Sequence, residues 1–377
     1  MNGFSYEILS FHLADSRTYR AFSGFSFAEQ KLPSKSTLQR YISKIKPKTL
    51  EKINRLILQY AKKLKIEDGR KARVDCTVVE SNIHKPYDSE SLWDCIRTIC
   101  RIGKRLGKKY GFKITDHRRV GKKVRRQIFG IKGKKKRDRL YRKLCKITRK
   151  VVDDAEMALE DLNYEKKDEK LIADFVVYCL LAKKVLHQTE SRLLRGEKVP
   201  AKEKIYSIFE LHTDMIIKAR RGIEYGHKIS LSCGISGMIL DLVIENGNPA
   251  DSKLATRMAD RLKEIYGKFP RDIAFDGGFA SKQNLQELKS RGIKNACFHK
   301  KCNLKIKEMV KSLWVYKRLK KFRAGIEGII SFLKRCFGLT RCTWKGLEHF
   351  HSYVWSSIVT ANTLIFARRI IARRKKE

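Results

Sequence analysis

The sequence predicts an α/β protein: a mixed sheet with flanking helices, a basic all-helical insertion and an N-terminal helical domain. Segments rich in β-branched residues alternate with amphipathic segments in the second half of the chain, which is typical of a sheet covered by helices. One similar strand pattern comes much earlier, at Arg73–Ser81, and a long run of helical patterns follows it. The 377 residues suffice for two or three domains.

The first domain, residues 1–66, has apolar residues at helical spacing and a helix start at Pro33 and Ser34. The helix that follows carries Lys35, Gln39 and Arg40. Short helices that end in such a basic helix favour a helix-turn-helix type unit, in which Lys35 and Arg40 contact DNA phosphates. A plain helical cap on the next domain is the alternative, and the sequence does not decide between them.

The predicted insertion covers residues 91–200 and is extremely basic in its first half. Between Arg101 and Lys150 there are 23 Lys and Arg against two Asp. We expect an exposed, mobile turn at Gly130–Arg139 and long amphipathic helices after it. The alternative without a binding role is a solvated charged bundle, but the mutual repulsion of so many like charges favours contact with DNA.

Residues 72–90 and 202–343 are predicted to form the core. Its later strands are predicted at Lys204–Leu211, Gly226–Cys233, Met238–Asn246, the apolar segment before Asp276, and Lys294–Lys300. A helix is expected at Asp251–Gly267 with Asp251 as its N-cap, and another with Ser281 as its cap. Residues 344–377 form a closing helix with a basic tail.

The overall charge points to a nucleic-acid partner. The formal net charge is +45 and the pI is about 10, and such a surface attracts polyanions. A membrane partner is not expected, because stretches such as Phe175–Ala182 are far too short to cross a bilayer. No secretory signal is recognisable, and the ten cysteines form no CxxC pair. We therefore expect a cytoplasmic protein associated with the nucleoid.

Three carboxylates stand at positions where chemistry is plausible. Asp276 follows a buried strand and precedes a glycine pair, where sites form in open α/β sheets; an ordinary turn is the alternative. Asp75 lies inside an apolar strand, where a carboxylate is costly unless it is paired or binds a cation. A strand face open to water, or pairing with Arg73, would also explain it.

Glu327 is the only Asp or Glu between Met309 and Leu347, a span with ten Lys and Arg. Helical spacing puts Arg323 and Lys334 on its face. An ordinary salt bridge between two residues of this helix is the alternative without a catalytic role. Together, Asp75, Asp276 and Glu327 can converge on two Mg²⁺ or Mn²⁺ ions that assist phosphodiester cleavage, with Arg323 and Lys334 holding phosphates.

Several segments together resemble the DDE transposases of bacterial insertion sequences, from about residue 4 to 369. They are "DCTVVESNIHKPYDSESLWD", "SIFELHTDMIIKARRGIEYGHKISL", "NGNPADSKL", "FDGGFAS" and "FRAGIEGIISFLKRCFGLTRCTWKG". The resemblance implies an RNase H-like core and catalytic, metal-binding roles for Asp75, Asp276 and Glu327. Arg323, Glu327 and Lys334 also fit the Tyr-(2)-Arg-(3)-Glu-(6)-Lys signature of such enzymes, whereas Lys320 stands at the Tyr position.

The resemblance implies a transposase that binds terminal inverted repeats, cleaves the DNA ends and joins them to target DNA. At least a homodimer is expected, since two ends must be brought together. Relatives tend to have more chain before the segment that resembles Ser5–Phe22, so we also expect an incomplete N-terminal domain. Two alternatives remain: an inactive DNA-binding remnant, and a metal-dependent nuclease that does not join strands.

Overall fold

The computed structural model describes residues 4–26, 28, 31–160, 162–218, 222–299 and 303–375. The chain divides into two compact units, which we describe separately. The first comprises residues 1–82 and 214–377, and the second comprises residues 83–213. The second unit encloses the whole of the predicted insertion, and the first contains the sheet.

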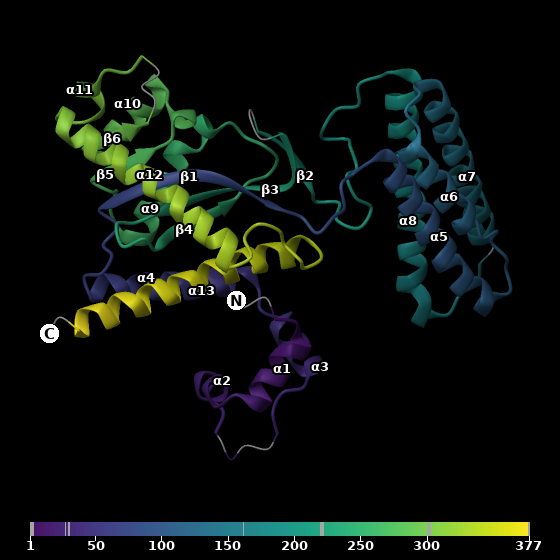
Figure 1. Cartoon of the computed structure of the whole chain (residues 1–377), viewed down its shortest axis with the longest axis horizontal. Coiled ribbons are helices and arrows are strands. Elements are labelled where there is room, and N and C mark those ends of the chain that lie inside the picture. The colour runs from purple at the N-terminus through teal and green to yellow at the C-terminus, as the bar shows by residue number, and fades with distance from the viewer. Residues whose placement is uncertain are drawn as a thin grey trace. The chain divides into compact units, whose positions relative to one another are not determined.

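The described residues form one six-stranded mixed sheet in the first unit (Figure 1). Its strands are β1 (Lys71–Glu80), β2 (Asp214–Lys218), β3 (Gly222–Cys233), β4 (Ile239–Ile244), β5 (Asp272–Phe275) and β6 (Asn295–Phe298). The order is β2-β3-β1-β5-β6, with β4 also paired to β3. β3 runs antiparallel to β1, β2 and β4, whereas β1, β5 and β6 are parallel. This sheet, flanked by helices, confirms the predicted RNase H-like α/β fold.

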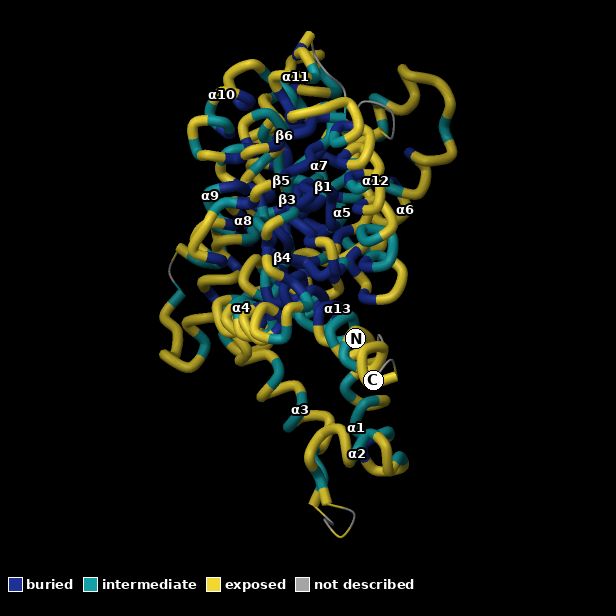
Figure 2. The backbone as a smooth tube through the Cα atoms, turned by 90° about the vertical axis from the view of Figure 1, so that its left-hand side faces the viewer, coloured by how far each residue is buried: buried dark blue, intermediate teal, exposed yellow. Residues whose placement is uncertain are grey.

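β1 is a central strand and is buried on both faces. Val74 packs into a core with β5, β6 and α9, while Val79 packs into a second core with β3, α12 and α13. In Figure 2 the tube around β1, β3 and β5 is coloured as buried. Since the strand is enclosed on both sides, a carboxylate on β1 needs a partner from the elements that cover it.

Helices cover the sheet and bring in the last acidic residue. Those of the core are α4 (Pro47–Lys63), α9 (Ala255–Tyr266), α10 (Lys282–Ser290), α11 (Ile306–Met309), α12 (Leu313–Cys336) and α13 (Leu347–Arg374). α4 and α13 lie side by side, and α12 runs across β1 and β5 (Figure 1). Ser312 caps the start of α12 by accepting from the Val315 amide, and Ser281 caps α10 as predicted.

The second unit is a helical bundle with its own apolar core. It contains α5 (Asp88–Tyr110), α6 (Arg118–Gly130), α7 (Lys134–Glu160), α8 (Glu169–Thr189) and a π-helical turn at Glu190–Arg195. Leu92, Ile96, Leu144 and Phe175 are fully buried in its core. The predicted turn at Gly130–Arg139 is wrong, because α7 begins at Lys134 and three residues suffice to link it to α6.

The N-terminal segment forms α1 (Tyr6–Asp15), α2 (Arg17–Phe22) and α3 (Lys35–Ile42). Ser5, Ser16 and Ser34 cap these helices with their side chains. A helix-turn-helix unit usually has a turn of three or four residues. The connection from α2 to α3 is longer, and it includes positions 27, 29 and 30 outside the described residues. The helix-turn-helix interpretation therefore stays a prediction.

Three local predictions need correction or comment. Lys204–Leu211 is no strand: Ile208 packs into the core of the helical bundle, and Gln188 hydrogen-bonds both backbone groups of Ile205. β2 was not predicted. Leu254, not Asp251, is the N-cap of α9, since a short 3₁₀ turn intervenes. β6 agrees with the predicted strand Lys294–Lys300, whose final residue lies outside the described part.

Candidate active site

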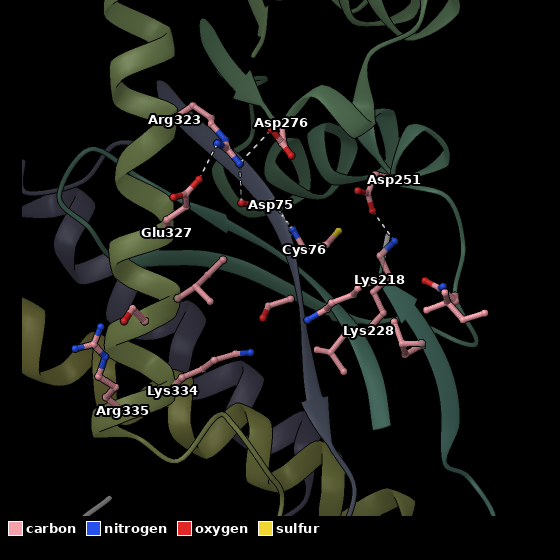
Figure 3. A pocket seen from close by; sticks show the side chains of 17 residues that line it. Asp75, Cys76, Lys218, Lys228, Asp251, Asp276, Arg323, Glu327, Lys334 and Arg335 are labelled. Atoms are coloured by element: carbon pink, nitrogen blue, oxygen red, sulfur yellow. Dashed lines mark hydrogen bonds and ion pairs between the residues drawn. The ribbon is translucent and has the colours of Figure 1, made fainter. Parts of the chain in front are cut away.

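Asp75, Asp276 and Glu327, here called the acidic triad, come from three different elements and meet at one arginine (Figure 3). Arg323 Nη2 lies 3.1 Å from Asp75 Oδ2 and 3.2 Å from Asp276 Oδ1, and Arg323 Nη1 lies 3.0 Å from Glu327 Oε1. Both Asp oxygens contact the same Arg323 nitrogen, so the distance between the two oxygens cannot exceed the sum of the two contact distances. The structure thus brings all four predicted residues together.

Sheet register places the two aspartates beside each other. β1 and β5 pair in parallel, with Val74 opposite Phe275 at the end of β5. Asp276 is the next residue and lies level with Asp75. This is the carboxyl end of β5, where sites form in open sheets.

Close contact between α12 and β1 places Glu327 and Arg323. A Cβ at Gly325 would lie only 2.3 Å from Nη1 of Arg73, a β1 residue. The same nitrogen donates to the Phe322 carbonyl at 2.8 Å, and the Arg73 guanidinium lies over the Phe322 ring. Gly325 therefore leaves room for the Arg73 guanidinium between α12 and β1 at the level of the triad.

Burial changes the protonation of Asp75. Its removal from water raises the pKa to about 6, and the nearby Asp276 and Asp251 carboxylates act in the same direction. The Arg323 charge and a hydrogen bond from the Cys76 amide, at 2.8 Å, act against this rise. Asp75 therefore titrates well above the usual range of an aspartate, even with a cation beside it.

A cavity of about 820 Å³ opens beside the triad. Basic side chains line its walls: Lys334 and Arg335 from α12, Lys218 from β2 and Lys228 from β3. Figure 3 shows Lys334 and Arg335 farther along α12 from the triad. Lys334 thus lies where the signature spacing predicted it, in the same cavity as Glu327.

The cavity also contains an acid that was not predicted as a site residue. Asp251 forms a 2.5 Å ion pair with Lys228, and Lys228 donates to the Pro249 carbonyl at 2.6 Å. A Cβ at Gly278 would lie 2.7 Å from the Asp251 carboxylate. The second glycine after Asp276 therefore makes room for Asp251. Asp251 lies in the segment "NGNPADSKL", where the sequence pattern predicts a helix cap and no site residue.

Lys35 and Arg40 do not line this cavity. Lys35 forms a 2.9 Å ion pair with Glu7, which joins α3 to α1, and both side chains are exposed. The Arg40 guanidinium lies over the ring of Tyr41. A contact of these two residues with DNA stays a prediction.

The donor set of the triad suits a hard divalent cation. All its side chains offer carboxylate oxygens, which Mg²⁺ and Mn²⁺ prefer. Three carboxylates face one guanidinium, so negative formal charge is in excess; the neighbouring Lys228 is already paired with Asp251. Within the described residues, no three His, Cys, Asp or Glu side chains are placed to hold a metal ion as they stand. Arg323 is the group on which the carboxylates now converge.

Acidic residues stand on the central strand of this RNase H-like sheet, after the neighbouring strand and on a later helix. Residues 211–363 match the family model of the transposase DDE domain, so the chain carries such a domain and the resemblance to DDE transposases is confirmed. The matched region includes Asp276 and Glu327, and Asp75 precedes it. Neither the curated proteins nor the solved structures include a match to this chain. No helix in the described ranges is both long and apolar enough to cross a bilayer.

Proposed function

We propose that this transposase binds the terminal inverted repeats of its insertion sequence and catalyses metal-dependent DNA cleavage and strand transfer. The observation that carries the proposal is the convergence of the triad on one point from β1, the end of β5 and α12. Glu327 is the one acidic residue of α12, and the chain as a whole is strongly basic. An acidic site within a basic protein suits metal-assisted chemistry on a polyanion.

Asp75, Asp276 and Glu327 would hold two Mg²⁺ or Mn²⁺ ions. Bound there, the ions would supply Lewis-acid stabilisation of the charge that develops in phosphoryl transfer. The buried position of Asp75 fixes one ligand rigidly on the central strand. The Glu327 side chain is 68 % exposed, so it can adjust when substrate enters. The chain's own residues would orient the oxygen ligands for this chemistry.

The basic walls of the cavity suit the backbone of the cleaved strand. Lys334 and Arg335 extend from α12 on one wall, and Lys218 extends from β2 on another. Ammonium and guanidinium groups pair with phosphate oxygens by charge-assisted hydrogen bonds. We assign to these residues the placement of a phosphate next to the triad.

The helical insertion supplies further DNA surface. The first part of α7, Lys134–Lys150, carries ten Lys and Arg, whereas residues 151–160 carry four acids and no base. This distribution opposes the helix dipole, which favours acids at the N-terminus and bases at the C-terminus. A bound polyanion would compensate for that unfavourable arrangement. Together with the N-terminal helices, the insertion would hold the DNA ends, and two copies of the chain would bring two ends together near the nucleoid.

Cleavage of the DNA that flanks the gene tests the proposal. Labelled end fragments would be incubated with the full chain and Mg²⁺, beside Asp276→Asn and Glu327→Gln. We expect cleavage at an inverted-repeat end and joined products with wild type, and loss of both, by at least about a hundredfold, in each variant. A shuffled repeat sequence serves as the substrate control.

The two alternatives give different results in the same experiment. A nuclease would yield cleaved ends without any joined product. A DNA-binding remnant would bind the repeats equally well in all three proteins, with or without Mg²⁺, and would never cut. Either result would contradict the proposed strand transfer.

A further inference from the structure

Arg323 occupies the centre of the acidic triad. Its two terminal nitrogens contact all three carboxylates, and its side chain is only 8 % exposed. Two other cations that line the cavity are paired elsewhere: Lys228 with Asp251, and Lys218 with Glu224. The guanidinium therefore neutralises part of the mutual repulsion among the carboxylates.

We propose that Arg323 is the counterion of the metal-free triad and that divalent cations must displace it in order to bind. This inference rests on the proposed function, because it assumes that the triad is the metal site. Asp75 and Asp276 share a single nitrogen of Arg323 at 3.1 and 3.2 Å. A metal ion needs these same oxygens at about 2.1 Å. Two cations at such short range repel each other strongly, so the guanidinium and the metal compete.

Displacement gives Arg323 a second position with a function. The cavity beside the triad runs along α12, and it is where the proposed function places DNA phosphate. A released guanidinium has lost its carboxylate partners and gains by pairing with a phosphate. Metal binding frees Arg323 to pair with phosphate, and bound phosphate holds Arg323 away from the metal ligands. Each of the two ligands would then raise the affinity for the other.

Mn²⁺ binding to the full chain without DNA tests the competition. Free Mn²⁺ would be measured by electron paramagnetic resonance with wild type, Arg323→Gln and Arg318→Gln. Arg318 is the matched control, since it is an exposed arginine of the same helix that does not line the cavity. We expect Arg323→Gln to bind Mn²⁺ about tenfold more tightly than wild type. Arg318→Gln should stay close to wild type.

Circular dichroism checks that the variants fold. If Arg323→Gln does not fold, Arg323→Lys decides, because a lysine keeps the charge but cannot contact all three carboxylates at once. It should bind Mn²⁺ more tightly than wild type. Unchanged or weaker Mn²⁺ binding in the folded Arg323 variant would overturn the inference and show that the arginine merely aligns the ligands.

The coupling is tested with Ca²⁺, an ion that occupies oxygen sites, and one DNA duplex. We expect Ca²⁺ to raise the DNA affinity of wild type and Arg318→Gln by the same factor, and to have little effect on Arg323→Gln. An equal factor in all three proteins would overturn the coupling. If neither wild type nor the folded Arg323 variants bind Mn²⁺, the metal site of the proposed function fails and the inference with it. If wild type binds Mn²⁺ but the Arg323 variants show no gain, only the inference fails.

Discussion

Asp75 is a buried carboxylate whose pKa is raised to about 6, so its folding energetics depend on pH. The folded protein binds this proton more tightly than the unfolded chain does. The stabilisation from the group is therefore complete below the unfolded pKa, near 4, and is lost as pH rises through about 6. A shift of about two units corresponds to about 3 kcal/mol, as an order of magnitude.

We predict that Asp75→Asn removes this pH dependence from the metal-free protein. Urea unfolding in the presence of a chelator would be measured for both proteins between pH 4 and pH 7.5. The free energy of unfolding of the variant should rise, relative to wild type, as pH increases across that range. The difference between the two proteins cancels the titration of other groups. Curves that stay parallel would contradict the raised pKa.

Single residues of the site could be predicted to different extents. Asp75 was recognisable because an ionised side chain in an apolar strand is costly, and Glu327 because it is a lone acid among bases. The contact of Arg323 with Asp75 was not recognisable, since the two residues are 248 positions apart and no local pattern links them. The Lys228–Asp251 pair was missed for the same reason.

At the scale of one element, α12 offers a matched pair of glycines. Gly325 faces Arg73 of β1, where a Cβ would be too close, whereas Gly328 has open space around its Cα. Gly325→Ala must push α12 from β1 or displace the Arg73 side chain from Phe322. The clash should cost about 1–3 kcal/mol, and alanine regains about 1 kcal/mol over glycine in a helix, so we expect a net loss of up to about 2 kcal/mol in unfolding free energy and weaker Mn²⁺ binding at the triad.

Gly328→Ala is the control and should act in the opposite direction. Alanine is favoured over glycine inside a helix by about 1 kcal/mol, and nothing obstructs the added methyl group. Thermal unfolding of both variants, with and without Mn²⁺, provides the measurement. Equal effects of the two substitutions would show that close packing of α12 on β1 does not place Glu327.

Element prediction succeeded where local pattern and burial agree. The apolar strands β1 and β5 and the helix α12 were predicted because both their composition and their spacing are distinctive. Lys204–Leu211 has the composition of a strand, but its apolar side chains pack on the helical bundle instead. β2 is short, and it forms only because β3 extends far enough to pair with it. Such outcomes depend on tertiary partners.

At the scale of the whole molecule, positive charge is concentrated in the helical insertion between β1 and β2. The helices α6 and α7 expose many Lys and Arg that form no ion pair with an acid of the described chain. Six of them are Lys122, Lys123, Arg126, Arg142, Lys143 and Lys146. Their apolar neighbours Val124, Ile128 and Leu144 fill the bundle core, so these basic side chains can be changed without altering its packing.

We predict that changing these six residues to Gln weakens DNA binding and reduces its salt dependence. Each phosphate contact that is lost should lower the slope of log affinity against log salt by about 0.9, because fewer counterions are released. Fluorescence anisotropy of a labelled duplex, titrated at several NaCl concentrations, measures both quantities. The unfolding free energy should change little, since all six side chains are exposed.

The control removes the same number of charges from the first unit, at exposed positions that do not line the cavity. These positions are Lys268, Lys282, Lys294, Lys305, Lys307 and Lys311. If the insertion is a DNA-binding surface, the first set must reduce the salt slope far more than the second. Equal slopes would mean that DNA senses only the net charge of +45, and the insertion would then be a solvated bundle without a direct part in holding the DNA.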